Sequence, residues 1–322
     1  SWINFMLATF NLVPGFPLDG GRISAPSSGA RPATSPGPHG SPQALAEARF
    51  AESGIKAADA RELGLEPLGA AAVQKLHPSF KAYPALRIPY FDIKGRKNGF
   101  YRLRYLGEMH GFDKLRKKAL RYVQAPDTDP EVYLPPLADW ARIAKDPAIP
   151  VLITEGEFKA AAATARGIPT IGLGGVWSWK SARRQVPFLP VLEQFTWKGR
   201  GVYMVFDSDF SSNPQVMRAL VALSRELNAR GAKPSLVALP DLPDLLEQGK
   251  KTGLDDFLVE SGKEKLGALL EDAVPYSQTE ELWRLNGEVV YIRDPGLVIV
   301  LQDGRKVAPG AFKEHAFANR HY

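Results

Sequence analysis

The 322-residue sequence contains no cysteine and only five histidines. Without cysteine the chain has no disulfide bond, no thiolate zinc site and no cysteine nucleophile. No two histidines have the spacing of a His-Glu-x-x-His helix, so we expect no zinc enzyme formed by this chain alone. Long apolar runs are also missing, because the stretch from Trp2 to Pro14 is too short to span a bilayer. We therefore expect no membrane association and a cytoplasmic location.

The composition is that of a soluble globular chain, with 44% apolar and 24% charged residues. It excludes a fully disordered protein and a polytopic membrane protein. The length suits two domains with extensions. A net charge of +6 suggests a polyanionic partner if the basic residues are concentrated in one region.

Basic residues are concentrated between Lys81 and Tyr122, where twelve Lys and Arg stand against three Asp and Glu. Aromatic residues alternate with them, and rings that stack on bases beside cations that contact phosphates are typical of a nucleic-acid groove. The alternative is a sheet with a solvated basic face and an aromatic core. The residues predicted to bind nucleic acid are Lys94, Arg96, Lys97, Arg102, Arg104, Lys117 and Lys118.

The chain divides into five predicted regions. Residues 24–42 are rich in Ala, Pro, Ser and Gly and are predicted to be a disordered linker. Residues 43–150 are predicted to be a basic α+β region, with helices over 43–76, broken at glycines, and strands over 86–106 around a turn at 94–99. Residues 276–322 are predicted to be a small β unit, with a helicase domain expected next if the parent protein continues.

Strands and helices alternate over residues 151–275. Strands are predicted at 151–154, 170–173, 202–206 and 235–239, and helices at 158–166, 214–230 and 263–271. This succession indicates an α/β fold, a parallel sheet flanked by helices on both faces. Ligands of such sheets bind beyond the carboxyl ends of the strands.

Carboxylates follow two of these strands. Glu155 ends the first, and Asp207 and Asp209 follow the third. Crowded carboxylates repel one another, and a hard divalent cation relieves this, so we predict a metal site in which no Lys or Arg neutralises all three carboxylates. The alternative is structural: Asp207 caps the following helix and Glu155 pairs with Lys159.

The same segments resemble the TOPRIM domain, and more closely the TOPRIM-like domain of unknown function in phage and plasmid primases. The resemblance rests on ITEGEFKA (153–160), IGLGGVWSW (171–179), VFDSD (205–209) and GLDDFL (253–258), with GFYRLRYLG (99–107) upstream, and covers about residues 75–275. It implies Mg²⁺ (or Mn²⁺) held by Glu155, Asp207 and Asp209, which would be the catalytic residues. Further candidate ligands are Glu157, Asp255 and Asp256.

Phosphate or nucleotide contacts are predicted near the second strand. Gly174 and Gly175 allow close backbone approach to an anion, although no Walker A or dinucleotide motif is present. Lys159 is placed at a helix start, where it contacts phosphate or forms an intrahelical salt bridge. Arg183 and Arg184 contact phosphate or lie on a solvated face.

The first 23 residues differ from the rest. The segment NLVPGFPLDGGR (11–22) resembles the zinc-ligand motif of site-2 metalloproteases, in which Asp19 matches the ligand. That family's His-Glu-x-x-His helix and membrane helices are missing, so we interpret residues 1–23 as a remnant or a joined fragment with a vestigial ligand.

The resulting hypothesis is a primase-like TOPRIM protein that performs Mg²⁺-dependent nucleotidyl transfer. Its expected partners are DNA, as a single-stranded template, nucleotides, and a replicative helicase domain or protein. The absence of a zinc module, which bacterial-type primases carry, departs from that family. The alternatives are TOPRIM phosphodiester cleavage, a non-catalytic DNA-binding module that recruits a helicase, and a fragment of a membrane metalloprotease.

Overall fold

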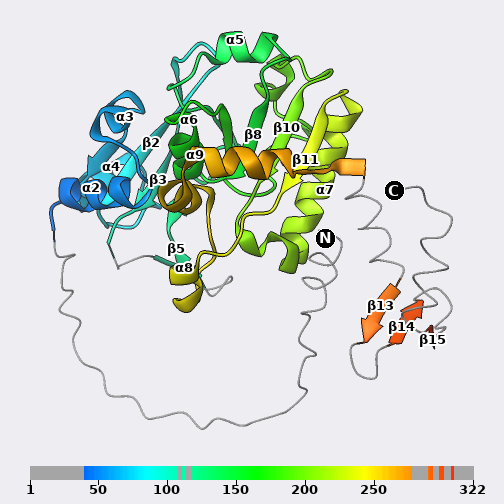
Figure 1. Cartoon of the computed structure of the whole chain (residues 1–322). Coiled ribbons are helices and arrows are strands. Elements are labelled where there is room, and N and C mark those ends of the chain that lie inside the picture. The colour runs from blue at the N-terminus through cyan, green and yellow to red at the C-terminus, as the bar shows by residue number, and fades with distance from the viewer. Residues whose placement is uncertain are drawn as a thin grey trace, which may run out of the picture.

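The computed structural model describes residues 40–107, 111–113, 118–277, 289–292, 297–300 and 306–307 (Figure 1). The predictions that concern residues 1–39, among them Asp19 and most of the linker, lie outside the described residues. So does Lys117. No helix in the described part of the chain is long and apolar enough to cross a membrane.

Residues 42–76 form short helices separated by glycines. The helices are α2 (Pro42–Glu52), α3 (Ala57–Glu62) and α4 (Ala70–Leu76). The side chain of Ser41 accepts a hydrogen bond from the N–H of Ala44 and caps α2, with Pro42 at its first position. The linker predicted to reach residue 42 therefore ends at this cap. Gly54 and Gly64 have φ of 62° and 64°, which glycine adopts without strain, and they end α2 and α3.

An antiparallel sheet follows, with strand order β1-β2-β3-β6. Its strands are β1 (Glu66–Leu68), β2 (Ala85–Phe91), β3 (Lys97–Tyr105) and β6 (Tyr122–Val123). Strands β4 (Gly111–Asp113) and β5 (Lys118–Leu120) pair separately. The turn between β2 and β3 lies earlier than predicted, because the Asp92 carboxylate accepts hydrogen bonds from the N–H groups of Lys94 and Arg96.

The central sheet has the order β12-β11-β10-β8-β9-β7. Its strands are β7 (Val132–Tyr133), β8 (Val151–Glu155), β9 (Thr170–Leu173), β10 (Gly201–Val205), β11 (Lys233–Val237) and β12 (Val274–Pro275). The four middle strands are parallel, and the two edge strands are antiparallel to their neighbours. The predicted α/β class is confirmed.

Helices cover both faces of this sheet. They are α5 (Trp140–Lys145), α6 (Glu157–Thr164), α7 (Pro214–Ala229), α8 (Pro243–Glu247) and α9 (Leu254–Glu271), with 3₁₀ turns η1 (Leu192–Gln194) and η2 (Ser208–Ser212). Alternate residues of a strand point to opposite faces. Val151 and Ile153 of β8 pack in the cluster that contains α7, whereas Leu152 packs in the cluster that contains α9. In Figure 1, α9 crosses in front of the strands.

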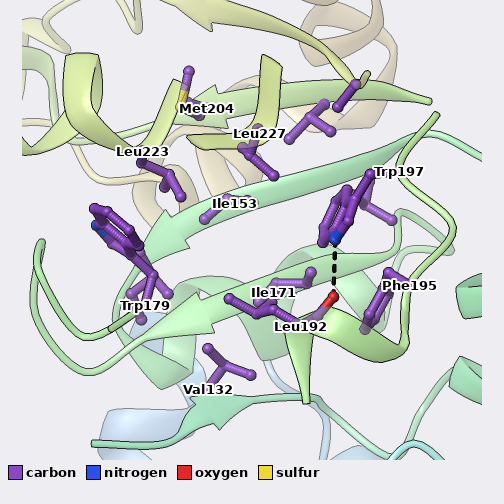
Figure 2. Close-up of a cluster of buried hydrophobic side chains, with 14 of the residues drawn as sticks. Val132, Ile153, Ile171, Trp179, Leu192, Phe195, Trp197, Met204, Leu223 and Leu227 are labelled. Carbon is purple, nitrogen blue, oxygen red and sulfur yellow. Dashed lines mark hydrogen bonds between the residues drawn. The ribbon is translucent and has the colours of Figure 1, made fainter. Parts of the chain in front are cut away.

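The cluster on the α7 face is rich in aromatic residues (Figure 2). Trp197 is buried, and its indole N–H donates to the carbonyl oxygen of Leu192 at 2.8 Å, so the polar atom of this ring is satisfied. The same cluster includes Val132 of β7 and Trp140 of α5. The central unit therefore extends upstream of the boundary predicted at residue 150.

Arg200 is a fully buried cation that the sequence did not single out. Its guanidinium donates hydrogen bonds to the carbonyl oxygens of Ile143, Ala144, Ile149 and Thr196. Burial lowers the pKa of Arg200, but an arginine remains protonated. The side chain thus ties the C-terminal end of α5 to the start of β10.

The C-terminal region contains the predicted small β unit. Strands β13 (Val289–Ile292), β14 (Leu297–Val300) and β15 (Lys306–Val307) form an antiparallel sheet in that order.

Candidate functional site

Glu155 and Asp207 lie at the same edge of the central sheet. Glu155 is the last residue of β8, and Asp207 comes two residues after β10. These strands are parallel neighbours, so their carboxyl ends meet at one edge. Asp209 follows in η2. The three carboxylates are close enough to interact, since Asp207 and Asp209 both act to raise the pKa of Glu155.

Two lysines form ion pairs with Asp207 and Asp209. Lys159 of α6 forms an ion pair with Oδ1 of Asp207. The ammonium of Lys251 lies 2.9 Å from Oδ2 of Asp207 and 3.4 Å from Oδ1 of Asp209. Among the described residues no single lysine forms an ion pair with all three carboxylates, and the metal site stays a prediction. The alternative predicted from the sequence was an ion pair between Lys159 and Glu155. In the structure Lys159 forms its ion pair with Asp207 instead.

The pKa shifts reflect this arrangement. Burial raises the pKa of Glu155, and the nearby Lys159 only partly opposes that effect. Burial alone would also raise the pKa of Asp207, but Lys159 and Lys251 outweigh it and hold the pKa below its ordinary value. The same ion pairs outweigh burial in the two lysines, whose pKa values are raised. In this arrangement Asp207 is therefore a carboxylate held between two ammonium groups.

The segment before α9 is fastened to the Asp207–Asp209 turn by backbone hydrogen bonds. The N–H of Ser208 donates to the carbonyl oxygen of Thr252 at 3.0 Å, and the N–H of Thr252 donates to the Ser208 hydroxyl at 3.1 Å. Gly253 follows, and a Cβ added there would lie 2.7 Å from Cε of Lys159. A glycine at this position therefore lets α9 approach α6 closely enough to confine Lys159.

Glu157, predicted as a further metal ligand, is part of a buried ion pair. It is only 1% exposed, and its Oε1 accepts hydrogen bonds from the Tyr90 hydroxyl and from Nη1 of Arg102, each at 2.7 Å. Gly156, with φ of 108°, reverses the chain after Glu155, so that Glu157 starts α6 beneath β2 and β3. Burial and the charge of Glu157 raise the pKa of Tyr90 well above its usual range.

Asp255 and Asp256 hold α9 in place and are not open ligands. Asp255 is 2% exposed and accepts hydrogen bonds from the Ser53 hydroxyl at 2.6 Å and from the Arg49 guanidinium at 3.1 Å. Asp256 accepts the N–H of Gly253 at 2.9 Å, which satisfies a free donor at the helix start. Each carboxylate therefore has a structural partner, and a role of either residue as a metal ligand stays a prediction.

The predicted nucleic-acid residues have different environments. Lys94, Arg96 and Lys97 are exposed at the turn between β2 and β3, where Arg96 pairs with Asp92. Arg102 is held by Glu157, so its prediction as an open DNA contact is wrong. Lys118 lies in β5, and its side chain is outside the described residues.

Arg104 forms no ion pair with any described residue. Its Nε donates to the Tyr122 hydroxyl at 3.2 Å, and its guanidinium lies 5.7 Å from the ring centre of Phe158. Arg49 lies over the same ring at 4.6 Å. Burial lowers the pKa of Arg104, and the nearby charge of Arg49 adds to that effect. We call Arg49, Arg104, Tyr122 and Phe158 the arginine–aromatic cluster.

The predicted phosphate contacts around β9 are engaged elsewhere. A Cβ added at Gly174 would lie 2.6 Å from Nη1 of Arg102, so this arginine fills the space beside the loop. Arg183 and Arg184 both pair with the buried Asp129. Phosphate contacts by Gly174, Gly175, Arg183 and Arg184 therefore stay a prediction, with Gly174 beside Arg102 and both arginines paired with Asp129 in this structure.

The carboxylates do not fit a metal ion as they stand. A hard divalent cation binds carboxylate oxygens, and both oxygens of Asp207 and one of Asp209 already contact ammonium groups. In the described part of the chain no three His, Asp or Glu residues are arranged to hold a metal.

Sequence reasoning missed Lys251, Arg49, Ser53 and Tyr90. The only signal for Lys251 is its position just before the Gly253–Asp256 segment. For the other three no local signal exists, since their partners are 67 to 206 residues away.

Known proteins are similar to the part of the chain that contains this site. The family described as a domain of unknown function (DUF3854) matches residues 139–265, about two fifths of the chain. An uncharacterized protein of Picosynechococcus sp. is 28% identical over 165 residues, which cover 47% of this chain and 15% of that protein. The chain therefore corresponds to a small part of that protein.

Among solved structures, the E. coli primase catalytic core is 17% identical with a TM-score of 0.51, over 76% of this chain and 77% of that one. A DnaG primase catalytic domain bound to single-stranded DNA is 17% identical with a TM-score of 0.52, over 77% of each chain. The fold is thus that of primase catalytic cores. The resemblance of residues 1–23 to site-2 proteases gains no support from these comparisons.

Proposed function

We propose that this chain is a primase-like protein of phage- or plasmid-type replication, which binds single-stranded DNA as a template and transfers nucleotides. The similarity of its fold to primase catalytic cores supports the proposal. The observation that carries it is the position of Glu155, Asp207 and Asp209 at the carboxyl edge of that sheet, where ligands of such folds bind.

The arginine–aromatic cluster is the surface we assign to DNA. Arg104 has no ion pair with a described residue, and a phosphate would supply an anion for it. Phe158 lies on α6 three residues after Glu155, so the cluster adjoins the carboxylates. The exposed Lys94, Arg96 and Lys97 extend the same basic region along β2 and β3.

Nucleotide transfer needs positive charge beside the phosphate that is attacked. The TOPRIM resemblance implies that Mg²⁺ or Mn²⁺ provides it. In the arrangement described here the positive charge at the carboxylates comes from Lys159 and Lys251 instead. We assign to these lysines the contact with nucleotide phosphates.

DNA binding is tested by fluorescence anisotropy with labelled single-stranded and duplex oligonucleotides. The logarithm of affinity should fall linearly with the logarithm of salt concentration, with a slope of about −0.7 per phosphate contact on single strands. Arg104→Ala should weaken binding several-fold and reduce the slope by about 0.7. Arg218→Ala is the matched control, because Arg218 is an exposed arginine on α7, on the opposite face of the sheet. Salt-independent affinity would place the DNA surface elsewhere.

Catalysis is tested by incubating the full chain with single-stranded templates, ribonucleotides or deoxyribonucleotides, and Mg²⁺ or Mn²⁺. We expect short products that require template and that are absent with Asp207→Asn. Cleavage of the template by the wild type but not by Asp207→Asn would instead assign the chain to TOPRIM nucleases.

A second candidate is a non-catalytic DNA-binding module that recruits a helicase. The neutralisation of Asp207 by two lysines favours it, since a paired carboxylate is the usual structural use of such a residue. Template binding that depends on Arg104, without any product in the presence of Mg²⁺ or Mn²⁺, would identify this function.

A further inference from the structure

The loop after β9 carries an exposed aromatic ring at the carboxyl edge of the central sheet. Leu173 ends β9 and is the strand partner of Glu155, the last residue of β8. Trp177 follows four residues after Leu173, so its Cα lies within about 14 Å of the Cα of Leu173. Trp177 therefore belongs to the same edge of the sheet as Glu155.

Trp177 is the one aromatic residue among the exposed large apolar side chains of the described residues, with an exposure of 37%. Its ring centre lies 6.1 Å from that of Trp179, which is buried in the cluster on the α7 face. The N–H of Ser178 donates to the carbonyl oxygen of Gly175 at 2.8 Å and closes the turn that holds both rings. A buried neighbour and a closed turn thus support a ring that solvent reaches.

A lysine without an ion pair lies over the same rings. The ammonium of Lys180 is 4.4 Å from the ring centre of Trp177 and 4.9 Å from that of Trp179, and no carboxylate in the described part of the chain pairs with it. The loop also contains Arg183 and Arg184, but both pair with Asp129. Lys180 is therefore the cation of this loop that is available to an anion.

The buried ring of the pair has an unsatisfied donor. Nε1 of Trp179 has no hydrogen-bond partner among the described residues, although a buried indole N–H usually has an acceptor, as Nε1 of Trp197 does. In Figure 2 the nitrogen of Trp179 lies on the side of the ring away from Ile153 and Leu223. A water or a ligand oxygen would complete this group.

Arg102 connects this loop to the arginine–aromatic cluster. A Cβ added at Gly174 would lie 2.6 Å from Nη1 of Arg102, and the guanidinium of Arg102 lies 5.2 Å from the ring centre of Tyr122. Tyr122 is also the residue that accepts the hydrogen bond of Arg104. A single strand bound at the cluster can therefore continue past Arg102 to Trp177.

We propose that Trp177 is a stacking platform for a base of single-stranded DNA and that Lys180 contacts the phosphate of the stacked nucleotide. An exposed indole face accepts any base, and an unpaired cation beside it suits the phosphate. The inference rests on the proposed function, because it extends the surface assigned to DNA. A free nucleotide has the same two groups, but the connection through Arg102 favours a strand.

The test is fluorescence anisotropy of the full chain with two labelled oligonucleotides, one of thymidines and one of the same length that lacks the bases. Trp177→Ala should weaken binding of the thymidine oligonucleotide about fivefold or more, which is the contribution of stacking on one base. The slope of affinity against salt should not change, because a base contact releases no counterions. The oligonucleotide without bases should bind wild type and Trp177→Ala equally.

Three further variants serve as controls, with thermal unfolding to show that each is folded. Trp177→Phe keeps an aromatic face and should retain most of the affinity. Lys180→Ala should weaken binding of both oligonucleotides and reduce the salt slope by about 0.7. Val259→Ala is the matched control, because it shortens an exposed apolar side chain on α9, and its affinity should equal that of the wild type.

Equal affinity of wild type and Trp177→Ala for the thymidine oligonucleotide would overturn the inference. An equal loss with the oligonucleotide that lacks bases would also overturn it, since stacking would then not be the cause. Binding of thymidine triphosphate that depends on Trp177, with unchanged oligonucleotide binding, would assign the ring to free nucleotides and reject the strand.

The proposed function fails separately from this inference. DNA binding that depends on Arg104 but not on Trp177 overturns this inference alone, whereas a wild type that does not bind single-stranded DNA overturns the proposed function.

Discussion

Replacing Glu157 with glutamine tests how the antiparallel sheet that contains β2 and β3 is joined to helix α6. Glu157 is buried and is the shared acceptor of Tyr90 and Arg102. Arg102 depends on this carboxylate, since its Nε has no hydrogen-bond partner among the described residues and its side chain is 12% exposed. Glu157→Gln keeps the shape of the side chain but leaves the arginine without a counter-charge.

The expected loss of unfolding free energy follows from that geometry. Removing one partner of a buried ion pair destabilises a protein by about 3–5 kcal/mol. The Arg102 side chain is still 12% exposed, so water can partly solvate its charge when the carboxylate is removed. We therefore expect a loss at the lower end of this range, about 3 kcal/mol. In a chain of this size that corresponds to a melting temperature lower by about 6–12 °C.

The assay is urea unfolding followed by tryptophan fluorescence, arranged as a double-mutant cycle with Arg102→Met. Each single variant should be destabilised, and the double variant should be more stable than the sum of the two losses predicts by about 2 kcal/mol or more, because no unpaired charge remains. A loss below about 0.5 kcal/mol in Glu157→Gln, or additive losses in the cycle, would refute the reasoning.

Three further predictions concern stability and the N-terminal segment. Arg200→Met should lower the free energy of unfolding by about 3–5 kcal/mol, because four carbonyl oxygens each lose one hydrogen bond; Arg200→Lys should be intermediate, and a neutral effect in urea unfolding would contradict this account. Gly253→Ala should lower the free energy of unfolding by about 1–3 kcal/mol, since the added Cβ meets Lys159 and Asp255. A melting temperature equal to that of the wild type would show that α6 and α9 can separate without a loss of stability. Deleting residues 1–39 should shift the melting temperature by no more than about 1 °C and should leave the anisotropy titration with DNA unchanged. A large change in either measurement would show that this segment docks on the rest of the protein.

Local patterns predicted much of the fold. The strand predicted at 170–173 coincides with β9, and the helix predicted at 214–230 differs from α7 by one residue. Period-2 and helical repeats of apolar residues are local properties, and the turn and cap residues that bound them are local too. The short strands β1 and β7 were not predicted, because a strand of two or three residues has no periodicity to detect.

The sequence by itself predicted that Glu155 and Asp207 lie at the same edge of the sheet, since the carboxyl ends of parallel strands share an edge. That their strands β8 and β10 are direct neighbours came from the structure. Only the tertiary structure decided which charges neutralise these carboxylates. Lys159 reaches Asp207 across 48 residues, and Arg49 reaches Asp255 across 206. A carboxylate in the sequence is equally suited to a metal ion, a lysine or a helix cap. The choice depends on which cation the folded chain brings within about 3–4 Å, and no local pattern contains that distance.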